Sequence, residues 1–551
     1  MKTFQIFVLI ALFMPLSLGA CTSAPSESNA VQSISEITTP TLQVLPTEKI
    51  LSLWVAPYLP QDIQTDMLLP ENVLLTDSQQ AADLWLDVAG DQPLSQWVYA
   101  LAAPFATVDD AITSQDLLKV WHGEIGVTSS LRRILVDGNT KAIFEKKWGP
   151  PSSSTVILTD VESLLSAAWS EDGSWAIIPF DSLETRWKVI TVDSISPIDD
   201  DFDMLNYALT VEFSLLGKSD DLQNFNTQVA AMGSVFIPVT NRDENKITTV
   251  VMTGVTALVR GTAYMMEKYG MTYPALDIGD ILRSADITHI SNEIPFTETC
   301  PNPFYNSAND ANLVFCSKPE YIALLDAIGT DVVELTGDHF RDWGADAMLS
   351  TLDMYDQRGW EYYGGGRNLA DGQQPALFEH NGNKIAFLGC NAKPEGYATA
   401  GIDYPGAVHC DMDEMAAQIK AVKTQGYIPV VTFQHIEYYA YTASPFLVQD
   451  FHTVAEAGAA IVSGSQAHQP QAFEFYHGSF LHYGLGNLFF DQYGEGFAQR
   501  QAFIDRYFIY NGRVLSTDLI TIMFVDMARS RLMNSDERQQ LLETIFSASG
   551  W

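Results

Sequence analysis

The stretch DVVELTGDHFRDWG, Asp331 to Gly344, places residues that bind metals or move protons directly after a short apolar run. The run ends at Gly337, and glycine allows a chain to leave a strand sharply. Asp338 and His339 follow at once, and carboxylate and imidazole groups are common metal ligands and proton carriers. The stretch therefore predicts a strand that delivers a metal-assisted site, or the remains of one.

Other apolar runs downstream end in polar residues in the same way. They are DITHISNE, KIAFLGCN, IPVVTFQH, AAIVSGSQAH and FLHYGLGNLFF, and helix-like stretches lie between several of them. Strands that alternate with helices are typical of α/β layers. Because ligands bind at the carboxyl ends of the strands in open α/β sheets, we expect a functional cleft where these runs end, at Asn292-Glu293, Asp338-His339, Gln434-His435, Gln466 and His468.

A second α/β region precedes this one. The runs KILSLWVAPYL, ADLWLDVAG, WVYALAAPF, SWAIIPF and KVITVD predict short strands. TSQDLLKVWHG and DVESLLSAAWS predict helices whose N-termini Thr113 and Asp160 cap. The polar stretch PVTNRDENK, around residues 238–246, separates the two regions. We therefore predict a first folded domain over residues 48–237 and a second over residues 247–551.

The N-terminus has the pattern of an export signal. MKTFQIFVLIALFMPLSLGAC carries Lys2, an apolar run and then small residues before Cys21, which predicts a secretory signal over residues 1–21. Its last four residues resemble the bacterial lipoprotein box. That resemblance implies a lipid on Cys21 and a protein anchored to the outer face of the bacterial cytoplasmic membrane or to the cell surface; the alternative is an ordinary signal with an incidental cysteine. Residues 22–47, rich in Ser, Thr and Pro, predict a flexible linker.

The net charge and the cysteine content limit the possible binding partners of the protein and its cellular compartment. The formal net charge is −38, from 30 Lys+Arg against 68 Asp+Glu. This excess argues against nucleic acid as a partner and would repel a polyanion unless cations bridge the two. If Cys21 carries lipid, an even number of cysteines remains, which favours disulfides outside the cytoplasm. Short local loops favour the pairs Cys300–Cys316 and Cys390–Cys410 over the other two pairings and over a zinc cluster.

One stretch of the first region is a candidate anion site. In GVTSSLRRIL, residues 126–135, the Thr and Ser residues would open a helix that bears Arg132 and Arg133, and helix N-termini bind anions through free N–H groups. The alternative is a capped helix with a solvated basic turn. APFATVDDAITSQDLLKVWHGE and WAIIPFDSLETRWKVITVDSISP make residues 48–235 similar to periplasmic substrate-binding proteins of the phosphate type, and this resemblance implies an α/β domain that binds a small ligand.

The second region resembles a known family. Its matching segments begin at VVMTGVTALVRG, at LTGDHFRDWGADAMLSTLDMYDQRGW and at PVVTFQHIEYYAYTASPFLVQDFHTV. Over residues 248–551 they are similar to the CapA-type poly-γ-glutamate capsule-synthesis family, whose fold is related to calcineurin-like metallophosphoesterases. The resemblance implies a calcineurin-like α/β sandwich and a role in capsule or envelope polymer synthesis or processing.

The chain departs from the family at several metal-binding positions. Val255 replaces the Asp of the opening Gly-Asp, and Asp338 replaces the Asn of the Asn-His motif. Gln434 and Gln466 stand where the family has His. The resemblance therefore implies one divalent ion, Mn, Mg or Zn, rather than two, and oxygen-rich ligands fit Mn, Mg or Ca better than Zn. Its expected ligands are Glu293, Asp338 and His468.

Two functions follow from these residues. The first is a metal-assisted hydrolase or transferase for an envelope polymer or a small anion, with His339 as general acid or base. Asp342 would orient that imidazole or cap the next helix. The second is a lipoprotein that binds the polymer or an anion without catalysis. The expected substrate-binding residues are Asn292, Gln434, His435, Gln466 and Asn487.

Overall fold

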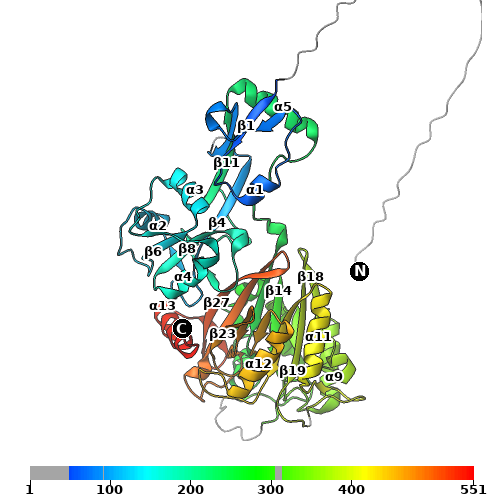
Figure 1. The fold of residues 1–551 in the computed structure, drawn as a ribbon. Helices are drawn as coiled ribbons and strands as arrows, with labels where there is room; N and C mark the ends of the chain where they lie inside the picture. Colours follow the sequence, from blue (N-terminus) through cyan, green and yellow to red (C-terminus); the bar gives the residue numbers. More distant parts are fainter. Residues whose placement is uncertain (1–48, 91, 305–312, 397) are drawn as a thin grey trace, which may run out of the picture. The chain divides into compact units, whose positions relative to one another are not determined.

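The computed structural model describes residues 49–90, 92–304, 313–396 and 398–551. The predicted signal, the lipidation site Cys21 and the linker 22–47 lie outside these ranges. Within them, no helix is long and apolar enough to cross a membrane. The residues before 240 and those after 246 build separate sheets (Figure 1), so the fold is a mixed α/β fold with several sheets.

The first region contains one large mixed sheet in the order β2-β1-β3-β11-β4-β8-β6-β7, with β9 beside β4. Its strands are β1 Leu51–Val55, β2 Val73–Leu75, β3 Leu84–Val88, β4 Ser95–Pro104, β6 Arg133–Val136, β7 Val156–Leu158, β8 Ser174–Pro179, β9 Trp187–Val189 and β11 Thr210–Gly217. The short strands β5 Ala111–Ile112 and β10 Thr191–Val192 pair with each other. The helices are α1 Gln61–Thr65, α2 Ser114–Trp121, α3 Gly138–Trp148, α4 Leu164–Ser170 and α5 Ser219–Met232.

The two predicted helix caps have different outcomes. The side chain of Thr113 accepts a hydrogen bond from the backbone N–H of Asp116 at 3.1 Å, which confirms the cap of α2. The Asp160 cap is wrong: this residue precedes a 3-10 turn, Val161–Ser163, and its side chain makes no capping hydrogen bond. The turn separates Asp160 from the start of α4, so Ser163 rather than Asp160 is the N-cap residue of that helix.

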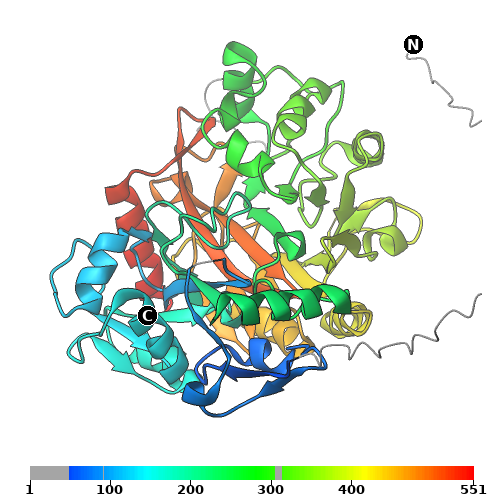
Figure 2. The ribbon, with the colours of Figure 1, turned by 90° about the horizontal axis from the view of Figure 1, so that it is seen from above.

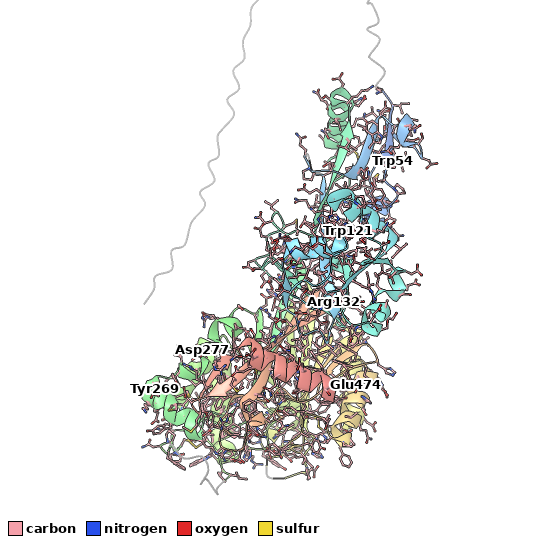
Figure 3. All side chains as sticks on the ribbon, turned by 90° about the vertical axis from the view of Figure 1, so that its left-hand side faces the viewer. Trp54, Trp121, Arg132, Tyr269, Asp277 and Glu474 are labelled. Carbon is pink, nitrogen blue, oxygen red and sulfur yellow. A yellow bond between two sulfur atoms is a disulfide. The ribbon has the colours of Figure 1, made fainter. Side chains whose placement is uncertain are left out.

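The helix predicted over residues 126–135 is also wrong. Arg133–Val136 form strand β6, between β7 and β8. The apolar run Ile134–Val136 is buried in the core of the first region, and such a run packs well on a half-buried sheet. The guanidinium of Arg132, labelled in Figure 3, donates to the backbone oxygens of Ser129 and Leu131, both at 2.8 Å. The stretch therefore offers no helix N-terminus for an anion.

Two larger sheets form the region after residue 246. The first runs β16-β15-β14-β12-β26-β27-β28, with β13 and β25 attached, and the second runs β18-β19-β21-β22-β24-β23. In the first, β12, β14, β15 and β16 are parallel; in the second, β19, β21, β22 and β24 are parallel. The strands are β12 Ile247–Thr253, β13 Val255–Thr256, β14 Ile287–Asn292, β15 Val332–Glu334, β16 Glu361–Tyr363, β18 Ala376–His380, β19 Asn383–Asn391, β21 Ile428–Gln434, β22 Ile461–Ser463, β23 Phe473–Tyr476, β24 Ser479–His482, β25 Asn487–Phe489, β26 Gln501–Tyr510, β27 Arg513–Val525 and β28 Arg529–Leu532.

Successive side chains of each strand point to opposite faces of its sheet. Val250 and Val430 belong to the core that both sheets share. Their neighbours Val251 and Val431 pack under helices on the outer faces. This gives helix, sheet, sheet and helix layers (Figure 1). The helices are α6 Arg260–Tyr269, α7 Gly279–Arg283, α8 Ile322–Ala327 and α9 Gly344–Asp356 on the first sheet, and α11 Met412–Thr424 and α12 Pro445–Ala457 on the second.

A C-terminal segment completes the first of these two sheets. The long antiparallel strands β26 and β27, orange to red in Figure 2, extend it beyond β12. Helix α13, Ser535–Ala548, follows them and begins with a capping box formed by Asn534 and Glu537. Leu541 and Ile545 of α13 enter the core shared by the two sheets. The segment thus closes one side of that core.

Both predicted disulfides are confirmed. Cys300 pairs with Cys316 across a sequence separation of 16 residues, and Cys390 pairs with Cys410 across 20. The second bond ties the end of β19 to the segment before α11. It therefore restrains a strand end next to the polar residues described below.

Candidate functional site

Polar residues meet where the parallel strands of the two sheets end. Glu293 follows β14, and Asp338 and His339 follow β15. From the second sheet, Lys393 follows β19 and Gln434 ends β21. The hydrogen bonds between Gln434 and Asp338 join the two sheets at this edge. The site thus lies at the carboxyl ends of the strands, as α/β architecture favours.

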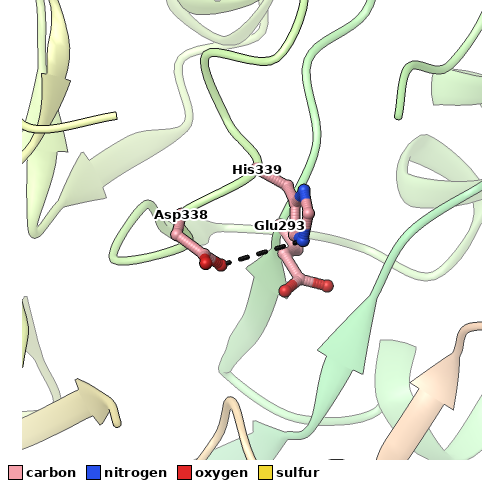
Figure 4. Close-up of side chains that lie close together, drawn as sticks. All are labelled: Glu293, Asp338 and His339. Carbon is pink, nitrogen blue, oxygen red and sulfur yellow. Dashed lines mark ion pairs between the residues drawn. The ribbon is translucent and has the colours of Figure 1, made fainter. Parts of the chain in front are cut away.

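Glu293, Asp338 and His339 form a compact group (Figure 4). Each offers a ligand atom, and these atoms all lie within 4.8 Å of one another. The side chain of Glu293 is buried, and its Oε2 has no hydrogen-bond partner among the described residues. A buried carboxylate oxygen without a partner is costly. This atom is therefore well placed to bind a cation.

The carboxylate of Asp342 forms a hydrogen bond with one ring nitrogen of His339. Its Nδ1 lies 2.8 Å from Oδ2 of Asp342, whose side chain is buried and also accepts the backbone N–H of Phe315 at 2.7 Å. Burial by itself lowers the pKa of His339, but the hydrogen bond to Asp342 and the charges of Glu293 and Asp338 raise that pKa to about 9. The Nε2 atom, 4.0 Å from Asp338 Oδ1, is left to serve a substrate.

The structure separates the two roles predicted for Asp342. Helix α9 has Trp343 as its N-cap, and no side chain caps it through a hydrogen bond. Asp342 contacts the imidazole of His339 instead. The geometry fits an orienting carboxylate, which sets the tautomer and the ring position of its histidine.

Both oxygens of Asp338 accept hydrogen bonds. Nε2 of Gln434 donates to Oδ1 at 2.8 Å, and the ammonium of Lys393 donates to Oδ2 at 2.9 Å. Lys393 also reaches Glu437 Oε1, at 2.5 Å. Burial alone raises the pKa of Asp338, but the charges of Lys393 and His339 and these hydrogen bonds lower it. Asp338 is therefore a carboxylate that already has partners.

A buried polar network supports the loops from below. Glu334, the last residue of β15, accepts hydrogen bonds from Thr336 at 2.6 Å and from Ser465. Nε2 of His289 lies 3.5 Å from the same carboxylate. Burial alone raises the pKa of Glu334, but His289, Ser465 and Thr336 lower it. The network connects the middle of β14 to the end of β15 and to the loop after β22, and so supports the loops that carry the site.

The predicted ligand His468 lies outside the group of three. Its Nδ1 is 2.9 Å from Oδ1 of Asn487. The structure brings His339 rather than His468 to Glu293 and Asp338. Near His468 lies Glu437; burial alone raises the pKa of Glu437, but the charge of Lys393 and its hydrogen bond lower it.

The remaining predicted substrate-binding residues bond mainly to protein. Asn292 is fully buried, and its Nδ2 donates to Tyr355 and to the backbone oxygen of Ile294. His435 pairs with Asp450 at 3.0 Å. The other three are Gln434, which spans both sheets, Gln466, which donates to Ser291, and Asn487, which donates to backbone oxygens of His468 and Gln499. Their roles toward a substrate stay predictions.

The opening loop is built for packing rather than for metal. Val255 is fully buried in a small apolar cluster with Ile294, Phe315 and Phe490. Before it, a Cβ on Gly254 would lie 1.8 Å from the backbone oxygen of Gly486. The close approach of two loops therefore requires glycine, and the side chain that follows is apolar.

The residues present fit one divalent ion. Four carboxylates, Glu293, Asp338, Asp342 and Glu437, stand beside the ammonium of Lys393 and the imidazole of His339. With that imidazole protonated, two cations against four anions leave two net negative charges. Glu293 and Asp338 would hold the ion, since carboxylate oxygens suit Mn or Mg. Val255 offers no ligand atom and Gln434 offers only a neutral amide where the family resemblance expects Asp and His, so the site has fewer ligands than that resemblance implies.

Sequence reasoning missed two charged residues of the site. Lys393 lies in NAKPEG, just after β19, and Glu437 lies in QHIEYY, just after β21. The rule that found Asp338, polar residues directly after a strand, would have found both. Their signal was weaker because Lys and Glu side chains are mostly exposed in proteins whatever their role.

The first region contains a cavity of about 580 Å³, which we call the first-region cavity. Aromatic residues such as Trp97, Tyr99 and Trp187 line it together with Arg186. Arg186 pairs with Glu184 at 2.6 Å, and both side chains are partly exposed. The carboxylates in the lining are Asp62, Asp137, Glu162, Asp181 and Glu184.

Comparison with known proteins identifies relatives of the second region. Residues 249–492 match the family described as bacterial capsule synthesis protein PGA_cap. The capsule biosynthesis protein CapA of Bacillus anthracis is 27% identical over 260 residues, which are 46% of this chain and 62% of that protein. A probable polyglutamine synthesis accessory protein of Mycobacterium tuberculosis is 28% identical over 190 residues, 32% of this chain and 50% of that protein. The chain therefore spans less than two thirds of the length of these curated relatives.

Two solved structures are weakly similar to parts of the chain. An ABC-type phosphate transport receptor from Vibrio cholerae is 12% identical with a TM-score of 0.27 and covers 33% of this chain and 93% of its own. A 5′-nucleotidase precursor from Thermus thermophilus is 10% identical with a TM-score of 0.32 and covers 55% of this chain and 58% of its own. Likenesses this weak concern the fold alone.

Proposed function

Because residues 249–492 belong to the CapA-type capsule-synthesis family, we propose that this chain synthesises or processes an anionic polymer of the cell envelope, of the poly-γ-glutamate class. The reaction we propose is metal-assisted hydrolysis or transfer at an amide or phosphoester bond. The observation that carries it is the group of Glu293, Asp338 and His339, with ligand atoms within 4.8 Å of one another.

Each residue of this group has a defined task in the proposal. A divalent ion bound to Glu293 and Asp338 would polarise the carbonyl or phosphoryl group of the scissile bond. His339 donates the proton on its Nε2 to the leaving group, since Asp342 engages Nδ1 at 2.8 Å. A bound divalent ion would also cancel the two net negative charges of the site, so that the site would not add to the repulsion that a net charge of −38 exerts on an anionic polymer.

The finer fold assignments belong to the same proposal. We propose that the second region is a calcineurin-like metallophosphoesterase-type sandwich, which its four layers support. We propose the first region as a ligand-binding α/β domain of the periplasmic type, which its mixed sheet and the first-region cavity support. The carboxylates in the lining of that cavity favour a neutral or cationic ligand.

We also propose that Cys21 carries a lipid that anchors the protein to the outer face of the membrane. The support is the signal pattern and the small residues before Cys21. Expression in bacteria with labelled palmitate tests it. The label is expected in the intact protein and absent from Cys21→Ser; equal labelling of both would remove the anchor from the proposal.

Metal content is the direct test of the proposed chemistry. The full chain, purified in detergent and equilibrated with Mn²⁺, is expected to hold about one equivalent by elemental analysis. Asp338→Ala should lose the ion, and the matched control Asp346→Asn, an exposed carboxylate on α9, should keep it. The unchanged protein should then release fragments from poly-γ-glutamate. A folded protein without metal would end the metal-assisted proposal.

One observation favours the alternative, a non-catalytic binding protein. Gln434 and Lys393 already engage both oxygens of Asp338, so this carboxylate exchanges existing partners when it binds a metal. The alternative predicts saturable binding of poly-γ-glutamate with no fragments released in the presence of Mn²⁺. If fragments of poly-γ-glutamate are released, and substitution of His339 abolishes their release, the protein is an enzyme.

A further inference from the structure

The ammonium of Lys393 lies between two carboxylates that come from different loops. Its Nζ is 2.9 Å from Asp338 Oδ2 and 2.5 Å from Glu437 Oε1. Only 14% of the lysine side chain is exposed. The contacts are thus those of a largely desolvated cation with two anionic oxygens, where electrostatic attraction is stronger than at an open surface.

The backbone holds Lys393 in this position. The N–H of Lys393 donates to Oδ1 of Asn391 at 2.8 Å, and Nδ2 of Asn391 donates to the backbone oxygen of Thr336 at 2.7 Å. Asn391 ends β19, and Thr336 follows β15. The backbone of Lys393 is therefore connected, through the hydrogen bonds of Asn391, to the loop after β15 that carries the candidate metal ligand Asp338.

Asp338 is shared between two neighbouring groups of residues. On one side it lies with Glu293 and His339. On the other side its Oδ2 meets Lys393, and Lys393 meets Glu437. A carboxylate with a cation on each side is the arrangement that a two-ion centre uses, with ions about 3.5–4 Å apart. Here the ammonium of Lys393 supplies the positive charge on one side of Asp338.

We propose that the ammonium of Lys393 takes the position between Asp338 and Glu437 that a second divalent cation would take, so that the site binds one ion. This inference rests on the proposed function, since it concerns the same metal site. The lysine contributes a fixed single charge and hydrogen-bond donors. It cannot act as a Lewis acid, so the polarising role falls on the one ion at Glu293 and Asp338.

The position has the ligands that a cation needs once the lysine is removed. Substitution of Lys393 by an uncharged residue leaves Asp338 Oδ2 and Glu437 Oε1 without their cation, and two neighbouring carboxylates, each only about 30% exposed, then repel one another. Mn²⁺ satisfies two such oxygens together with water. The second ion is therefore expected in the variant and not in the unchanged protein.

Metal stoichiometry and paramagnetic resonance test the inference on the full chain in detergent. Lys393→Met keeps most of the side-chain volume and removes the charge, while Lys393→Arg keeps the charge. With Mn²⁺, the unchanged protein and Lys393→Arg should bind about one equivalent and show the spectrum of isolated ions. Lys393→Met should bind about two and show the spectrum of a coupled pair.

A control variant and the melting temperature show whether a second ion depends on the loss of Lys393. Lys384→Met removes an exposed lysine that pairs with Glu379 and should leave one ion. The melting temperature of Lys393→Met should rise more with Mn²⁺ than that of the unchanged protein, which also reports whether the variant folds. Two ions in the unchanged protein, or one in a folded Lys393→Met, overturn this inference alone. No ion in the unchanged protein overturns the metal-assisted function as well.

Discussion

Substitution of Asp342 by Asn isolates what keeps the proton on His339. The change preserves the size of the side chain and removes the negative charge that lies 2.8 Å from Nδ1. An Asn still reaches the ring, so the imidazole should keep its place. What should change is the affinity of His339 for its proton, because a neutral amide stabilises the imidazolium much less than a carboxylate does.

The magnitude follows from the pKa of His339. A rise from 6.5 to about 9 corresponds to about 3 kcal/mol in favour of the protonated ring. Asp342, Glu293 and Asp338 share this stabilisation against the cost of burial. Because the folded-state pKa is raised, the stabilisation is fully present below pH 6.5 and is lost as the pH rises through about 9. Asp342→Asn should remove about half of it, or roughly 1–2 kcal/mol.

Two measurements on metal-free protein check this prediction. Titration of the His339 ring by NMR should give a pKa near 9 in the unchanged protein and a value well below that in Asp342→Asn. Urea unfolding should show a free energy of unfolding that falls between pH 6.5 and 9 in the unchanged protein and falls less in the variant. Asp346→Asn should match the unchanged protein. A pKa near 9 in Asp342→Asn would refute the role of Asp342.

Three further predictions concern the scaffold and the first region. Gly254→Ala should lower the free energy of unfolding by about 3 kcal/mol, because the new Cβ would lie 1.8 Å from the backbone oxygen of Gly486. Gly138 has open space around it, so Gly138→Ala should change the free energy of unfolding little in the same urea titration. Joint replacement of Cys390 and Cys410 by Ala should cost about 3 kcal/mol, the loop-closure entropy of a 20-residue separation, and a loss below 1 kcal/mol would contradict it. Inorganic phosphate should give no binding heat by calorimetry, since carboxylates dominate the lining of the first-region cavity; a millimolar or tighter dissociation constant would disprove this.

Local patterns were enough for the strands and for part of the site. The runs ending in Asn292, Asp338 and Gln434 predicted β14, β15 and β21 and placed their polar residues at one edge. These predictions succeeded because a buried strand and the polar residues that follow it form a pattern of consecutive residues. The same reasoning failed at residues 126–135, where burial of Ile134–Val136 in the first sheet outweighed the helix-start signal of the Thr and Ser residues.

The sequence by itself determined the α/β class, the strand ends and the two disulfides. Only the tertiary structure decided how the charges combine. Lys393 lies 55 residues from Asp338 and 44 from Glu437 along the chain, and nothing local to any of the three predicts that they meet. The physical reason is that hydrophobic burial and backbone pairing position the strands, while the balance of charge at their ends depends on which distant loops those strands bring together.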